Sequence, residues 1–238
     1  QFMKFNFQIK IFRYNRPHYG GKEMNKSIKR YILIVLGFMT VGIACAFTLK
    51  ANIGVGAWDA LAKSSSDIFG IEVGTMGIVF NCSCVVGQII ILRKKFKPIQ
   101  LLQVPLSVLL GVVINFVLYE VLTFEFNSFA GGILMYIAGS TVCAFGVSIV
   151  MLLDEVTFAL EGFCMALTNV ISAKFHIVRQ GADILSVIAV VILTLIFKIS
   201  WSIGVGTIIG MLTFGPTLGI FMKIFKPILK KHNLLNYE

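Results

Sequence analysis

The stretch "GGILMYIAGSTVCAFGVSIVMLL" (residues 131–153) contains no charged side chain. A helix of about 20 apolar residues is long enough to cross the roughly 30 Å hydrocarbon core of a bilayer. Helices on the surface of soluble proteins are apolar on one face only, whereas this stretch would be apolar all round. It therefore predicts a transmembrane helix.

The rest of the 238-residue chain has the same character. Hydrophobic residues make up 57% of it and charged residues 13%, against about 25% charged residues in an average soluble domain. The fold class predicted is all-α, a polytopic membrane protein with six transmembrane helices. We expect these spans at about 31–49, 73–92, 101–122, 131–153, 182–197 and 204–225.

The formal charge of +10 is concentrated at the ends of the apolar runs. Basic residues precede the first span, follow the second as "RKKFK" (93–97) and follow the last. Lysine and arginine collect in cytoplasmic loops of membrane proteins, so we expect both termini to be cytoplasmic. The charge then reflects orientation in a bacterial inner membrane, and we expect no nucleic-acid partner.

The chain divides into a membrane domain and two tails. Residues 1–23 form a basic, aromatic tail, residues 24–228 the membrane domain, and residues 229–238 a cytoplasmic tail. The stretch from Met24, "MNKSIKRYILIVLGF", looks like a native start with a short basic lead. Two interpretations of residues 1–23 stay open: a non-native segment, or a basic arm that touches anionic lipid.

No pattern typical of catalysis or metal binding is present. The five cysteines form no CxxC pair, and no Ser-His-Asp or HExxH arrangement occurs. We expect no enzymatic activity, no cofactor and no metal site. The cysteines, which lie in or beside apolar segments, are interpreted as packing residues: Cys45, Cys82, Cys84, Cys143 and Cys164.

Two polar connectors interrupt the apolar pattern, at residues 51–72 and 154–178. Aligning Asp59 of the first connector with Glu161 of the second makes the two halves of the chain similar, at about 31–122 and 131–225. Each half would contain three spans, so the second half would enter the membrane with the opposite orientation. The pattern predicts an inverted repeat, which in many secondary transporters places the substrate site between the halves.

Asp59 is the first candidate site residue, because a carboxylate at membrane depth is costly and usually faces a cavity or a partner. Gly54 and Gly56 precede it and are predicted to break the helical path of the backbone. A second interpretation stays open. Asp59 would then stabilise the start of an exposed interfacial helix, with Trp58 as an aromatic anchor.

Further polar residues lie in or between the spans. Glu161 is the counterpart of Asp59 and faces either the repeat axis or water. Asn81 and Asn115 are candidates to line a substrate site, although amides in spans more often hold helices together. Arg179 and Asp183, four residues apart, are interpreted as a stabilising ion pair.

The last span carries two GxxxG pairs, Gly206/Gly210 and Gly215/Gly219. Small residues at this spacing let helix backbones approach each other closely. They allow a homodimer and serve packing within one chain equally well.

The segments "NIGVGAWDAL" (52–61), "FGIEVGTMGI" (69–78) and "IGVGTIIGMLTFGPTLGIF" (203–221) together resemble the YczE/YyaS/YitT-like bacterial integral membrane proteins. The resemblance covers Met24 to about Ile228. The second half departs from the pattern, with "DEVTFALEG" (154–162) where a glycine-rich stretch with an acid is expected. The resemblance implies a membrane protein of a family whose function is largely unassigned.

The leading functional hypothesis is a small secondary carrier whose substrate, a small molecule, binds between the halves near Trp58, Asp59 and Glu161. Asp59 or Glu161 would be the titrating group of a proton- or ion-coupled mechanism. The alternative is an accessory protein that does not transport and binds lipid or another membrane component through its GxxxG faces.

Overall fold

A computed structural model describes residues 21–124 and 128–235. The predicted tail at residues 1–23 and the end of the C-terminal tail lie largely outside the described residues. The described chain is all-helical, without strands. Its α-helices are α1 (Gly21–Lys50), α2 (Ala57–Phe69), α3 (Val73–Leu92), α4 (Gln103–Asn115), α5 (Phe129–Leu153), α6 (Ala159–Ile171), α7 (Phe175–Phe197) and α8 (Val205–Lys231).

Six of the described helical segments are long and apolar enough to span a membrane, which confirms the predicted fold class. They are Lys26–Lys50, Val73–Lys95, Pro98–Val121, Phe129–Leu153, Phe175–Phe197 and Val205–Lys231. The fifth begins earlier than the predicted residue 182, because Arg179 and Asp183 pair with each other and let a charged turn continue the helix. The third ends in a π-helical segment, Phe116–Val121.

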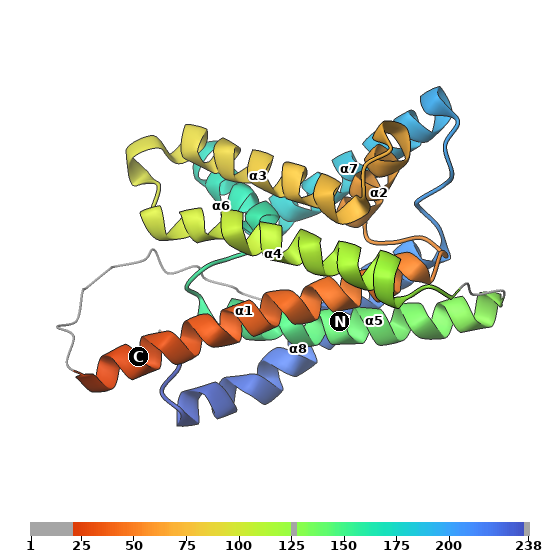
Figure 1. The fold of residues 1–238 in the computed structure, drawn as a ribbon. Coiled ribbons are helices and arrows are strands. Elements are labelled where there is room, and N and C mark those ends of the chain that lie inside the picture. The colour runs from red at the N-terminus through yellow and green to blue at the C-terminus, as the bar shows by residue number, and fades with distance from the viewer. Residues whose placement is uncertain (1–20, 125–127, 236–238) are drawn as a thin grey trace, which may run out of the picture.

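The helices form two layers (Figure 1). In one layer α1 packs along α5, with α8 against α5. The other layer contains α2, α3, α6 and α7, and α4 contacts both α1 and α3. The α1–α5 contact is close because small residues line it: a Cβ atom on Gly37 would lie 2.6 Å from Val150 Cγ2.

One end of the bundle carries most of the basic residues and is called the basic end below. Here α1 begins, α3 turns into α4 and α8 ends, on the left of Figure 1. The opposite end is called the far end. The two short helices, α2 and α6, have 13 residues each, too few to span a bilayer. In Figure 1, α2 lies toward the far end and α6 toward the basic end.

The segment between α1 and α2 leaves the helical path and is fixed against the start of α8. Gly54 has φ +98°, a value that favours glycine. The Val55 N–H donates to the Ser202 carbonyl (3.1 Å), and the Gly206 N–H donates to the Ile53 carbonyl (2.7 Å). The Thr207 hydroxyl donates to the Val55 carbonyl (2.7 Å). We call residues 53–55 and 202–207, held by these bonds, the far joint.

The start of α6 is fixed by buried amides from α3 and α4. Gln88 and Gln103 are 2% and 1% exposed, and the Gln88 amide donates to Gln103 Oε1 (2.8 Å). The Gln88 amide also donates to the carbonyl of Ala159, the first residue of α6 (3.1 Å). Paired amides satisfy each other away from water, so they hold three helices together without leaving an unbonded polar group.

Candidate functional site

The first turn of α2 lies beside the middle of α3. The Trp58 indole N–H donates to Asn81 Oδ1 (3.3 Å), and the Trp58 ring lies 5.9 Å from the ring of Phe80. Asn81 is about 12 Å along α3 from its start, at 1.5 Å per residue. Trp58 and the adjacent Asp59 are therefore inside the bundle and away from its far end. The joint at Gly54 allows this, because it turns the chain back before α2 begins.

A guanidinium group lies between α6 and α7. Arg179 Nε is 3.2 Å from Glu161 Oε1, and Arg179 Nη1 bonds to Asp183 Oδ1. The side chains of Arg179 and Glu161 are both 27% exposed, so the bridge is partly buried. Partly accessible charges within the span of a membrane protein usually face a water-filled space or each other.

Asp59 lies on α2, which packs on α7, within electrostatic reach of this bridge. The charges of Arg179, Asp183 and Glu161 all act on its carboxylate. Among the described residues, the Asp59 side chain forms no hydrogen bond and no ion pair of its own. Burial raises the pKa of Asp59 from 3.8 to about 6; Arg179 opposes the shift, and Asp183 and Glu161 add to it. The group can therefore gain and lose a proton near neutral pH.

The structure thus brings together four of the five polar residues that the sequence suggested for substrate binding: Trp58, Asp59, Glu161 and Asn81. It adds Arg179 and Asp183, whose spacing in the sequence predicted only a stabilising pair. The spacing of these two residues was visible in the sequence, but the position of Glu161 beside them depends on the packing of α6 against α7.

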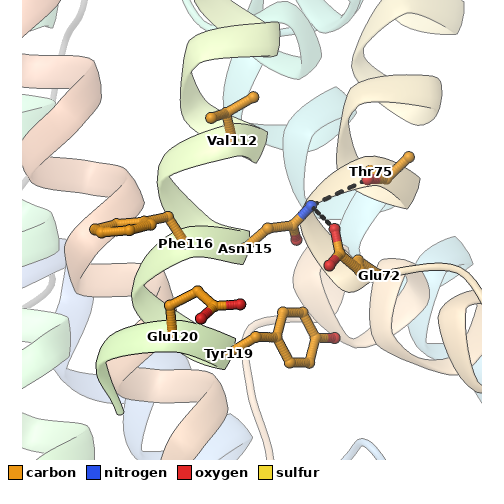
Figure 2. Close-up of a pocket in the computed structure, with 7 residues that line it drawn as sticks. All are labelled: Glu72, Thr75, Val112, Asn115, Phe116, Tyr119 and Glu120. Atoms are coloured by element: carbon orange, nitrogen blue, oxygen red, sulfur yellow. Dashed lines mark hydrogen bonds between the residues drawn. The ribbon is translucent and has the colours of Figure 1, made fainter.

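The fifth residue, Asn115, lies elsewhere, at the far end, where α4 ends. Figure 2 shows it beside Glu72 and Thr75. Its Oδ1 accepts from the Gly74 N–H (2.7 Å), and its amide donates to Glu72 (2.7 Å) and Thr75 (3.0 Å). These bonds hold the start of α3 against α4. The recess around Asn115 has a volume of about 340 Å³.

The GxxxG glycines divide into two groups. A Cβ atom on Gly206 would lie 2.2 Å from the Gly54 carbonyl, and one on Gly210 would lie 2.3 Å from the Tyr136 hydroxyl. This first pair therefore lies against the far joint and α5. Gly215 and Gly219 have open space within 4 Å of such an added atom. No group of three or more His, Cys, Asp or Glu side chains in the described residues is placed to hold a metal ion.

Six spanning helices with a charge cluster between two short helices define a multi-pass helical membrane protein. A family model described as a family of unknown function, DUF6198, matches residues 28–223. The match covers most of the chain, so the protein belongs to this family. Comparisons with curated proteins and with solved structures found no match.

Proposed function

We propose that the protein is a secondary carrier whose substrate binds beside Asp59, Glu161 and Arg179, between α2, α6 and α7. The observation that supports this most is the Asp59 carboxylate, which lies inside the bundle without a bonding partner among the described residues and interacts electrostatically with a bridged guanidinium. An ionisable group in such a place is costly, and membrane proteins use such groups in proton relays and substrate pathways. Its pKa of about 6 suits proton coupling.

The contacts between helices support an inverted repeat, in which α1 to α4 would correspond to α5 to α8. The short helix of each half packs against a long helix of the other half: α2 against α7, and α6 against α3. Likewise α1 contacts α4, as α5 contacts α8. One correspondence is missing, because α3 packs extensively on α4 while α7 and α8 make no comparable contact. Carriers built from such repeats bind substrate between the halves.

The basic end would face the cytoplasm of a bacterial cell. The end of α3 lies at the same end of the bundle as the end of α8 (Figure 1). Arg93, Lys94 and Lys95 follow α3, and Lys230 and Lys231 are the last residues of α8. Such basic clusters favour the cytoplasmic side of the inner membrane. The site would then open alternately towards the cytoplasm and towards the outside.

The proposal is tested by ligand-induced thermal shifts of the purified protein across a library of metabolites, at pH 5 and pH 8. We expect at least one solute to raise the melting temperature in a pH-dependent way. Asp59→Asn and Glu161→Gln should abolish the shift. Asp67→Asn is the matched control, because Asp67 lies on the same helix but pairs with Lys63 (3.3 Å). Equal shifts in all four proteins would place the binding site elsewhere and contradict the proposal.

The second candidate function, an accessory protein, is favoured by one observation: Gly215 and Gly219 face open space on α8. Under this alternative, cross-linking in native membranes should capture one repeated partner through α8. Gly215→Leu and Gly219→Leu should abolish that capture. Gly206 and Gly210 are unsuitable for this test, because larger side chains there would disturb the contact with Tyr136.

A further inference from the structure

The guanidinium of Arg179 is already engaged on two sides. Its Nε faces Glu161 and its Nη1 faces Asp183. A site that binds an anion through arginine needs the donors of that arginine to be free for the ligand. Here an anion on the remaining donors would lie beside two carboxylates that come from different helices, α6 and α7, and would be repelled by both.

The carboxylates in the cluster outnumber the cations. Asp59, Glu161 and Asp183 carry three negative charges when ionised, and Arg179 carries one positive charge. The nearest other cation on α2, Lys63, is paired with Asp67 in the following turn. Glu161 and Asp183 share the single positive charge of Arg179, so the ionised cluster has an excess of negative charge, and Asp59 is its carboxylate without a paired cation. A charge in this position is stabilised by a proton or by another cation.

The other groups that act on Asp59 supply no positive charge. Cys45 on α1 and Tyr136 on α5 both interact electrostatically with Asp59. Cys143 on α5 interacts with Cys45 and Tyr136. The described part of α3, which packs on α2, contains no charged residue in Val73–Leu92. Arg179 is thus the one cation among the described residues that acts on the carboxylate.

An aromatic side chain, Trp58, belongs to the same first turn of α2 as this carboxylate. The Trp58 indole is oriented by its bond to Asn81 and packs near Phe80. It also packs against the cluster of apolar residues formed by α3, α6 and α7, which includes Val178 and Ala182 on the helix of Arg179 and Asp183. Indole faces attract organic cations, and an indole and a carboxylate in one helical turn offer two groups that attract an ammonium group.

We propose that the substrate is an organic ammonium cation that binds at Asp59 beside Trp58 in exchange for a proton. Binding of the cation releases the proton of Asp59 to water, and return of the proton releases the cation. No covalent bond forms or breaks. The inference rests on the proposed carrier function and adds the charge and chemical class of its substrate.

The test uses the full-length protein in liposomes that contain the pH-sensitive dye pyranine, at equal pH inside and outside. Tetramethylammonium, choline and tetraethylammonium chloride are the probes, since a quaternary cation carries no proton of its own. Adding a probe outside should make the lumen alkaline, because the entering cation drives protons out. Asp59→Asn should slow the initial rate at least tenfold, and Asp67→Asn should leave it unchanged. Asp59→Glu, which keeps the carboxylate, should retain a response and shows that the loss is not one of folding.

Sodium succinate and glycerol are the comparison solutes. A response to succinate or glycerol without one to the ammonium probes would overturn the substrate class while leaving the carrier function in place. An ammonium response that persists in Asp59→Asn would overturn the assignment to this carboxylate. No response to any solute, together with no thermal shift in the metabolite library, would overturn the carrier function as well.

Discussion

Gly54 and Gly204 approach each other so closely that a Cβ atom on Gly54 would lie 2.2 Å from the Gly204 backbone nitrogen. The two residues belong to opposite halves of the chain, and their contact is the centre of the far joint. The joint decides where α2 begins, and α2 carries Trp58 and Asp59 in its first turn. The position of the candidate site therefore depends on a contact between two backbones 150 residues apart in sequence.

Replacing Gly54 with alanine should destabilise the protein strongly. The φ of +98° is unfavourable for any residue with a Cβ atom, and the added methyl group would overlap the backbone of Gly204. We expect a cost of about 2 kcal/mol or more, since backbone strain and overlap act together. Gly77→Ala is the control, because nothing lies within 4 Å of an added Cβ there and the helical site favours alanine. Similar melting temperatures for both variants in detergent would contradict this account of the far joint.

Leucine in place of Gln88 or Gln103 should cost about 1–3 kcal/mol, because each change removes one hydrogen-bond partner of the other buried amide. The double variant should cost less than the sum of the two single changes, by about 1 kcal/mol. The measurement is the free energy of unfolding of the four proteins in a double-mutant cycle. Strict additivity would mean that the two amides do not stabilise each other.

Asn115→Leu should lower stability by about 1–3 kcal/mol, because the Gly74 N–H and the Glu72 carboxylate lose a bonding partner. It should not change the response to a substrate, since Asn115 lies apart from Asp59. Glu120→Gln changes a side chain of the same recess (Figure 2) and should cost less than about 0.5 kcal/mol. Loss of transport with unchanged melting temperature in Asn115→Leu would instead make the recess part of the site.

The six spans could be predicted from the sequence. A helix that crosses a bilayer needs about 20 consecutive apolar residues, and few other structures contain such a run. The start of α7 was predicted too late. The spacing of Arg179 and Asp183 predicted their ion pair, but the pattern does not show that Arg179 also bonds to Glu161. The alignment of Asp59 with Glu161 identified the two connectors that contribute to the site. Their proximity could not be predicted, because it follows from the packing of α2 on α7 and of α6 on α3.

The bonding partners of the amide side chains could not be predicted from the sequence either. Asn81, Gln88 and Asn115 each predict that a partner exists, because an unbonded amide is costly in hydrocarbon. The sequence does not say which partner is present. In the structure Asn81 accepts from Trp58 and lies at the candidate site, whereas Asn115 bonds to the start of α3 at the far end.

Changes to the charges around Asp59 should move its pKa in predictable directions. Arg179 lowers the pKa of Asp59, so Arg179→Gln should raise the pH at which Asp59 ionises. Glu161 raises it, so Glu161→Gln should lower that pH. The pH midpoint of the Trp58 emission, in a Trp201→Phe background, reports the change, because Glu161→Gln is expected to abolish the ligand-induced thermal shift. Midpoints that stay equal in both variants would show that the three groups do not act on one another.

The central claim is that Asp59 is the titrating group inside the bundle, and the fluorescence of Trp58 tests it most directly. The chain has two tryptophans, so Trp201→Phe leaves Trp58 as the single reporter beside Asp59. The carboxyl group should be neutral below its pKa of about 6 and ionised above it, and the emission of Trp58 should change with a midpoint near pH 6. The account predicts that Asp59→Asn abolishes this transition. A transition near pH 4, or one that survives in Asp59→Asn, would contradict it.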